Sequence, residues 1–222
     1  MRRYAPLSMG LLCLAAAGAA AAGKPSPVIP DWKESHFAEA DPAVWTAFRL
    51  AVCARNQRRA AVEALLATPP LSAEEARLFP VAVPPGGTGC PMRKAWTVRF
   101  TATFMRGALA EALYNGDKDK PRAPSLPLTE SFDAAGKDEP SLVARWVARC
   151  AVRRDPLRAH EVVQFNPGAI GERRALLALG PVLAACLPAG ERLQVSRLRF
   201  RALIAQELYQ ASLSFKESFT HA

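Results

Sequence analysis

The chain has 222 residues, of which 50% are hydrophobic, 22% charged and 8% aromatic. This composition provides enough apolar residues for a folded core and excludes a mainly disordered or collagen-like chain. Proline outnumbers glycine, and alanine, leucine and arginine outweigh valine and the aromatic residues. This balance favours helices joined by proline-containing loops. No sequence motif assigns a biochemical activity.

The start of the chain has the layout of a secretory signal peptide. Two arginines follow Met1, and residues 7–22 are almost entirely apolar or small. Ala20 and Ala22 then occupy the −3 and −1 positions of a cleavage site before Gly23. We therefore expect a soluble mature protein in a periplasm or outside the cell.

Two alternatives to cleavage are less consistent with the same residues. An uncleaved anchor would need roughly 20 strongly apolar residues, and this alanine-rich stretch is shorter. A lipoprotein is disfavoured because Cys13 follows Leu12, where a lipidation site requires a small residue. Cleavage also lowers the formal net charge from +9 to about +7. A basic exported protein is attracted to polyanions, anionic membrane surfaces or acidic partners.

Four cysteines remain after cleavage, and an internal repeat suggests how they pair. Four cysteines in an exported chain indicate two disulfides with three possible connectivities. The block around Cys53 aligns with the block around Cys150, and Arg106–Tyr114 matches Arg201–Tyr209 without a gap. One residue inserted in the second copy places Glu74 opposite Glu172.

The duplication predicts one bridge within each copy, Cys53–Cys90 and Cys150–Cys186. A metal site or a redox pair is the alternative, but the sequence has no CxxC motif and contains three histidines. Structural disulfides are therefore the preferred interpretation.

The predicted fold is all-α, with two tandem four-helix repeats that each contain one intra-repeat disulfide. Helix starts are indicated by caps at Ser72, Thr101, Asp155 and Ser196. An apolar face is predicted in the last helix of each copy, by Met105, Ala108, Leu109 and Leu113 and by Phe200, Leu203, Ile204 and Leu208. The expected organisation is a signal peptide (1–22), a proline-rich lead-in (23–40), repeat 1 (41–115), a linker (116–138), repeat 2 (139–212) and a tail (213–222).

No catalytic, cofactor-binding or metal-binding residue is assigned. The glycine-rich segment 84–89 lacks the Gly-Lys-Ser/Thr ending of a phosphate-binding loop and is interpreted as a turn. His160 and Glu161 are adjacent, so on a helix they diverge by about 100° and do not share a face. The position matching His160 in the first copy is taken as Val62, which favours a structural histidine.

The unusual charge feature is a stripe of three arginines, Arg145, Arg149 and Arg153, spaced i, i+4, i+8. No acid lies three or four residues from any of them, so Glu172 and Glu191 could reach them only through tertiary contact. The stripe is either a solvated face or a site for an acidic envelope polymer, an anionic lipid or an acidic protein. Nucleic acid is not expected, because the chain is exported and contains no recognisable module for it.

The cysteine spacing and the block Arg106–Tyr114, with their second-copy counterparts, resemble an uncharacterised family of exported bacterial proteins. That family has no known activity, so the resemblance transfers no functional residue. The favoured hypothesis is a non-enzymatic binding or structural module of the cell envelope. The alternatives are an envelope hydrolase with a site between the two repeats and a peripheral binder of anionic lipid.

Cleavage of the signal peptide can be tested on the protein recovered from cells. The basic start and the small-residue site predict that the mature chain begins near Gly23, because signal peptidase cuts after such a site. Mass spectrometry of the intact mature protein measures this directly. Recovery of a chain that keeps Met1 in the envelope fraction would contradict the prediction.

Overall fold

The structure is a computed structural model, which describes residues 42–84, 89–90, 101–117, 132 and 140–220. This part of the chain forms seven α-helices, which confirms the predicted all-α fold. They are α1 (Pro42–Ala67), α2 (Ala73–Ala82), α3 (Ala102–Gly116), α4 (Pro140–Arg154), α5 (Pro156–Gln164), α6 (Ile170–Cys186) and α7 (Arg197–Thr220). No helix in the described ranges is long and apolar enough to cross a membrane.

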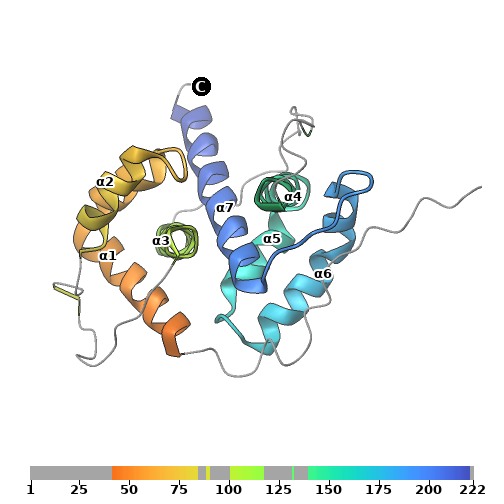
Figure 1. The fold of residues 1–222 in the computed structure, drawn as a ribbon, viewed down its shortest axis with the longest axis horizontal. Coiled ribbons are helices and arrows are strands. Elements are labelled where there is room, and N and C mark those ends of the chain that lie inside the picture. The colour runs from red at the N-terminus through yellow and green to blue at the C-terminus, as the bar shows by residue number, and fades with distance from the viewer. Residues whose placement is uncertain (1–41, 85–88, 91–100, 118–131, 133–139, 221–222) are drawn as a thin grey trace, which may run out of the picture.

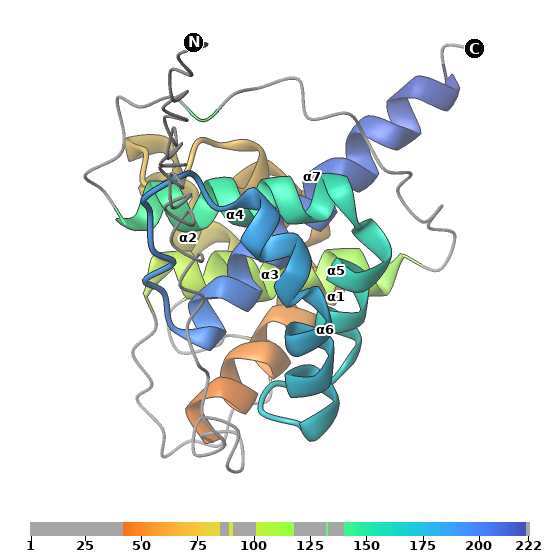
Figure 2. The same cartoon turned by 90° about the vertical axis from the view of Figure 1, so that its right-hand side faces the viewer.

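Helices α3 and α7 lie at the centre of the molecule (Figure 1), with α1 and α2 on one side and α4, α5 and α6 on the other. The two central helices approach closely at Gly107, where an added Cβ would collide with the Cβ of Ala202. The far end of α7 extends beyond the other helices (Figure 2). We expected a tail at 213–222, but α7 remains helical to Thr220, since neither proline nor glycine interrupts this segment.

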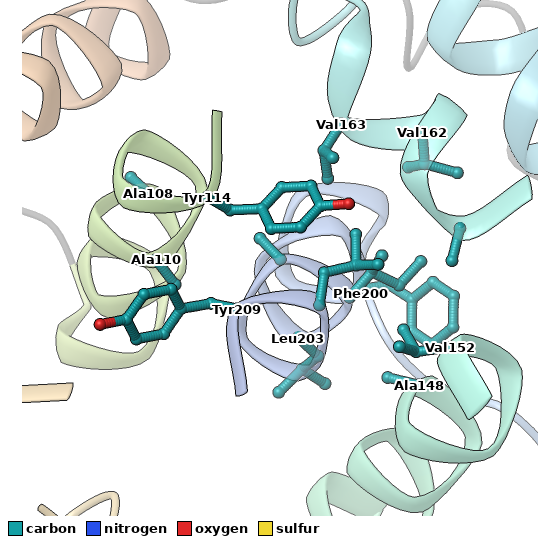
Figure 3. Packing of buried hydrophobic residues seen from close by; sticks show 14 of the residues in the cluster. Ala108, Ala110, Tyr114, Ala148, Val152, Val162, Val163, Phe200, Leu203 and Tyr209 are labelled. Carbon is teal, nitrogen blue, oxygen red and sulfur yellow. The ribbon is translucent and has the colours of Figure 1, made fainter. Parts of the chain in front are cut away.

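One continuous apolar core joins all seven helices of the described chain. The apolar faces predicted for α3 and α7 are confirmed, because all eight side chains are buried. Figure 3 shows how the two central helices share this core. The ring of Tyr114, from α3, lies toward Val163 of α5, and the ring of Tyr209, from α7, lies beside α3. The N-terminal half (α1–α3) and the C-terminal half (α4–α7) are therefore packed as one body.

Side-chain caps fix several helix starts where the sequence predicts them. Ser72 accepts a hydrogen bond from the N–H of Glu75, and Thr101 accepts one from that of Phe104. Asp155 caps α5 in the same way. Repeat 1 was expected to contain four helices, and its described residues form three, α1 to α3, with a break inside α1 at Arg58, which has the non-helical angles φ −138° and ψ 37°. The side-chain caps at Ser72, Thr101 and Asp155 satisfy backbone N–H groups that have no partner within the helix.

Both predicted disulfides are formed. Cys53 bonds to Cys90 over a separation of 37 residues, and Cys150 bonds to Cys186 over a separation of 36. The second bridge joins α4 to the last residue of α6, and the indole of Trp146 also donates to the Cys186 carbonyl over 3.2 Å. Closing a loop of this size contributes about 3–4 kcal/mol in the chain-entropy account.

A buried arginine holds the end of α1 against α2 and α3. Arg106 donates from Nη1 to the carbonyl of Leu65 and to Oε1 of Glu75, both over 3.0 Å. Its Nη2 donates to the carbonyls of Leu66 and Thr68 over 2.8 and 2.7 Å. Carbonyls at the end of a helix lack the N–H donors of a following turn. The guanidinium supplies donors to them, beside the N–H of Thr68 that bonds to the Leu65 carbonyl, and links three elements.

Arg201 makes the corresponding contacts in the C-terminal half. Its Nη1 donates to the carbonyl of Val162 over 2.8 Å and pairs with Oε1 of Glu172 over 3.2 Å. Its Nη2 donates to the carbonyl of Phe165 over 2.8 Å. The end of α5 is thus held against α6 and α7 by the same kind of contact.

The two acids that pair with these arginines each also hold a turn that contains a residue with positive φ. Glu75 accepts a hydrogen bond from the backbone N–H of Leu71, and Glu172 accepts one from that of Gly168. Leu71 has a φ of 64° and Gly168 a φ of 86°. A left-handed conformation costs a leucine roughly 1–2 kcal/mol, so the Glu75 contact helps to hold Leu71 in it.

These contacts favour a different alignment of the N-terminal and C-terminal halves. We expected Glu74 to match Glu172, but Glu75 makes the contacts that Glu172 makes, while Glu74 is exposed and pairs with Arg77. In this stretch the two halves therefore align without an inserted residue. The same alignment places His160 opposite Glu63 rather than opposite Val62.

A further acid joins the two halves directly. Both carboxylate oxygens of Glu111, on α3, accept from Arg201, on α7, over 2.6 and 2.9 Å. Arg197 adds an ion pair with Glu172. Burial raises the pKa of Glu111, and the charge of Arg201 acts against that rise. Removing one member of such a buried cluster leaves an uncompensated charge.

The two neighbouring acids of α2 provide a matched test of this arrangement. Glu75→Ala leaves the buried guanidinium of Arg106 without its carboxylate, so we expect a loss of about 3–5 kcal/mol in the free energy of unfolding. Glu74→Ala removes an exposed acid, so we expect a change within about 0.5 kcal/mol. Urea unfolding followed by circular dichroism measures both. Equal losses for the two variants would contradict the assignment.

Candidate functional site

The three arginines of the stripe line one wall of a cleft between the two halves. They project from α4 and are half-buried, while the opposite face of the same helix packs into the core through Val147 and Ala151. The second wall is the end of α1 and the turn after it, residues 66–70, and α7 contributes the floor. The hollow encloses about 420 Å³. We call it the arginine cleft, defined by Arg145, Arg149 and Arg153.

An acid on the floor of the arginine cleft faces the stripe. Nε of Arg149 lies 3.2 Å from Oε2 of Glu207, whose side chain is 16% exposed. Burial raises the pKa of Glu207, while Arg149, followed by Arg145 and Arg153, opposes that rise. The stripe is therefore partly compensated within the molecule.

This acid was not predicted from the sequence. Glu172 and Glu191 were the acids expected to reach the stripe only through tertiary contact, and Glu172 instead pairs with Arg197 and Arg201. Glu207 comes from α7, one helical turn after buried Leu203. Its spacing from Leu203 is the signal that could have identified an acid on the inner side of that helix.

Apart from the guanidinium of Arg106, which pairs with Glu75, the other polar groups of the arginine cleft are neutral and largely bound in hydrogen bonds. The amide of Gln210 donates to the carbonyl of Leu66 over 3.3 Å, and that of Gln206 donates within its own helix. Burial raises the pKa of Tyr209, with the charge of Glu63 adding to the effect, so its hydroxyl stays protonated. Among the described residues that line the cleft, Glu207 is the one carboxyl and no histidine, serine or cysteine is present. The cleft therefore offers charge recognition rather than a nucleophile with its base.

A second cleft lies between α1 and the end of α5, beside α3. Its walls are the outer face of α1, with Trp45, Phe48 and Val52, and the segment after α5, with Phe165. It encloses about 540 Å³. We call it the aromatic cleft, defined by those four residues.

The two clefts have corresponding frameworks and different linings. Phe48 and Val52 have the same spacing from Cys53 that Arg145 and Arg149 have from Cys150. The framework is matched too: Asn115 donates to the carbonyl of Val163 over 3.0 Å, as Gln210 does to that of Leu66. Arginine thus replaces apolar side chains at corresponding positions in one cleft.

The remaining sequence candidates do not form a site. Nδ1 of His160 lies 2.9 Å from the hydroxyl of Tyr114, so the histidine joins α5 to α3. The described residues contain no cluster of His, Cys, Asp or Glu that could hold a metal ion. Most of the glycine-rich segment 84–89 lies outside the described residues.

Comparison with known proteins finds no match to a family model, to a curated protein or to a solved structure.

The raised pKa of Glu207 predicts a pH-dependent difference between the wild type and Glu207→Gln. The ionised carboxyl is less favourable in the folded chain than in the unfolded chain, in which the pKa of this group has its ordinary value of 4.5. Wild-type stability therefore falls relative to that of Glu207→Gln as the pH rises through the folded-state pKa. Urea unfolding at pH 4 and pH 8 should show a larger advantage for Glu207→Gln at pH 8. A difference that is independent of pH would contradict this.

Proposed function

We propose that this protein is an exported, non-enzymatic binding module of the cell envelope that holds an anionic polymer in the arginine cleft. The observation that carries the proposal is the placement of charge. Three arginines line one wall of a concave hollow, and the one carboxylate among its described lining residues is Glu207. Guanidinium groups suit carboxylate, sulfate and phosphate groups, because their planar N–H donors match two oxygens at once.

The shape of the site favours a chain over a flat surface. From Arg145 to Arg153 the stripe extends along α4 for about 12 Å, at 1.5 Å per residue. It lies inside a hollow whose other wall is residues 66–70. A linear polyanion can lie along such a groove and meet successive arginines, whereas the headgroups of a planar membrane would reach its rim first.

The disulfides support the proposed export. Two disulfides indicate that the chain folds in an oxidising compartment outside the cytoplasm. This agrees with the proposal that residues 1–22 are a signal peptide and that the mature protein is periplasmic or extracellular. The acidic polymers of the envelope would then be accessible to the arginine cleft.

The proposed descent of the two halves from one duplicated unit accounts for the existence of two clefts. It is supported by the matching contacts of Arg106 and Arg201 and by the matching left-handed residues Leu71 and Gly168. On this proposal, duplication produced two equivalent hollows, and the arginines are a property that the second copy acquired or kept alone.

Heparin chromatography tests the arginine cleft with a soluble polyanion. The variant Arg145→Ala/Arg149→Ala/Arg153→Ala should elute at lower salt than the wild type, because it lacks the cationic wall. Retention should also fall steeply with salt, since exposed charges are screened over about 8–10 Å. The measurement is the salt concentration at elution.

A matched control separates the cleft from net charge. Arg174, Arg192 and Arg199 are exposed and lie outside the lining of the arginine cleft, so their triple alanine variant loses the same charge elsewhere. It should elute closer to the wild type than the cleft variant does. Equal elution of the cleft and control variants would refute the proposal. Wild-type flotation with anionic vesicles, without heparin retention, would favour the lipid alternative.

A further inference from the structure

The aromatic cleft brings three exposed large apolar side chains together in one hollow. Trp45, Val52 and Phe165 are 39%, 43% and 43% exposed, and all three line this one hollow of about 540 Å³. Each square ångström of apolar surface that a ligand covers contributes about 25 cal/mol. Hollows of this volume lie within the range that holds small ligands in proteins, about 300–1,000 Å³.

The walls of the aromatic cleft are held in place before any ligand arrives. The ring of Phe48 packs edge to face against Phe104, with centroids 6.1 Å apart, and the guanidinium carbon of Arg201 lies 5.5 Å from its centroid. The ring of Phe165 occupies the space beside Gly171, where an added Cβ would collide with it. A ligand would therefore lose little affinity to ordering these walls.

The polar groups at the rim of the aromatic cleft leave one cation available. The amide of Asn115 donates to Val163, and its oxygen accepts from Gln164. Both oxygens of Glu111 are bound by Arg201, so this acid is neutralised. Arg49 is exposed, lies one helical turn after Trp45, and has no ion-pair partner among the described residues.

An apolar hollow with a cation at its rim is complementary to a molecule with an apolar body and an anionic head. We propose that the aromatic cleft is a second binding site, which takes a monomeric anionic amphiphile such as a fatty-acid-like carboxylate. The hydrocarbon or aromatic body lies against Trp45, Val52 and Phe165, and the anionic head pairs with Arg49. This site does not depend on the proposed function of the arginine cleft.

The dye 8-anilinonaphthalene-1-sulfonate, itself an aromatic anion, provides the probe. Its fluorescence should rise on binding to the wild-type protein, and decanoate below its micelle concentration should displace it. Val52→Asp places a negative charge in the hollow and should lower the affinity for the dye and for decanoate at least ten-fold. Leu177→Asp is the matched control, because Leu177 is 64% exposed on α6, outside the lining of the aromatic cleft, and should leave both affinities unchanged.

The role of the cation is tested separately. Arg49→Gln should lower the affinity for decanoate at least five-fold and leave displacement by neutral decanol unchanged. Arg174→Gln, on the exposed surface of α6, should change neither quantity. Wild-type decanoate affinity in both Val52→Asp and Arg49→Gln would overturn the proposal. Equal losses of affinity in the variants and in their controls would also overturn it, since that result indicates that the dye binds to apolar surface outside the aromatic cleft.

The two proposals can fail independently. Val52→Asp and Arg49→Gln should elute from heparin at the same salt concentration as their charge-matched controls, Leu177→Asp and Arg174→Gln. The triple alanine variant of the arginine cleft should retain wild-type decanoate affinity. Loss of decanoate binding in that triple variant would mean that the amphiphile occupies the arginine cleft and would overturn the second site.

Discussion

The guanidinium of Arg201 bonds to three other helices from its place on α7. It closes the end of α5, pairs with Glu172 on α6 and takes both oxygens of Glu111 on α3. Arg106 forms a similar junction in the N-terminal half, with Glu75 as its acid. Only a planar group with five donors can meet so many acceptors at once. Because a buried charge without partners is costly, each junction requires all of its acceptors to stay in place, and the packing of the helix ends depends on it.

These junctions also determine where the clefts lie. Arg106 holds the end of α1 where it forms a wall of the arginine cleft, and Arg201 holds the end of α5 where it forms a wall of the aromatic cleft. The shape of each hollow thus depends on buried ion pairs, and one member of each pair, Arg106 or Glu111, reaches the lining of a cleft. Its chemistry comes mainly from side chains of α4 and α1 that face the hollow, of which Phe48 also packs against the core. Shape and ligand preference are therefore separable in this fold.

Features set by residues close together in the sequence could be predicted, and features set by contacts between helices could not. The caps at Ser72 and Asp155 and the apolar face of α7 are local patterns, and the repeat spacing is enough to pair the cysteines. The choice between Glu74 and Glu75 depends on which of two adjacent acids turns inward, and the left-handed turn at Leu71 sets that rotation. Glu207 reaches the stripe from another helix, so no spacing within α4 could reveal it.

The two clefts also exclude each other's proposed ligands. An apolar chain in the arginine cleft would have to displace water from three guanidinium groups, which is unfavourable unless anions replace that water. A polyanion in the aromatic cleft would meet one exposed cation, Arg49, and would place its remaining charges against Trp45 and Val52. Near the buried junctions the difference is equally clear: the guanidinium of Arg201 lies over the ring of Phe48, whereas the corresponding position in α4 is Arg145. That second arrangement brings like charges into one region, and Glu75 and Glu207 supply the negative charge that compensates them. The acids that permit an arginine wall are thus part of the same framework, which explains how one helical scaffold can carry two sites of opposite character.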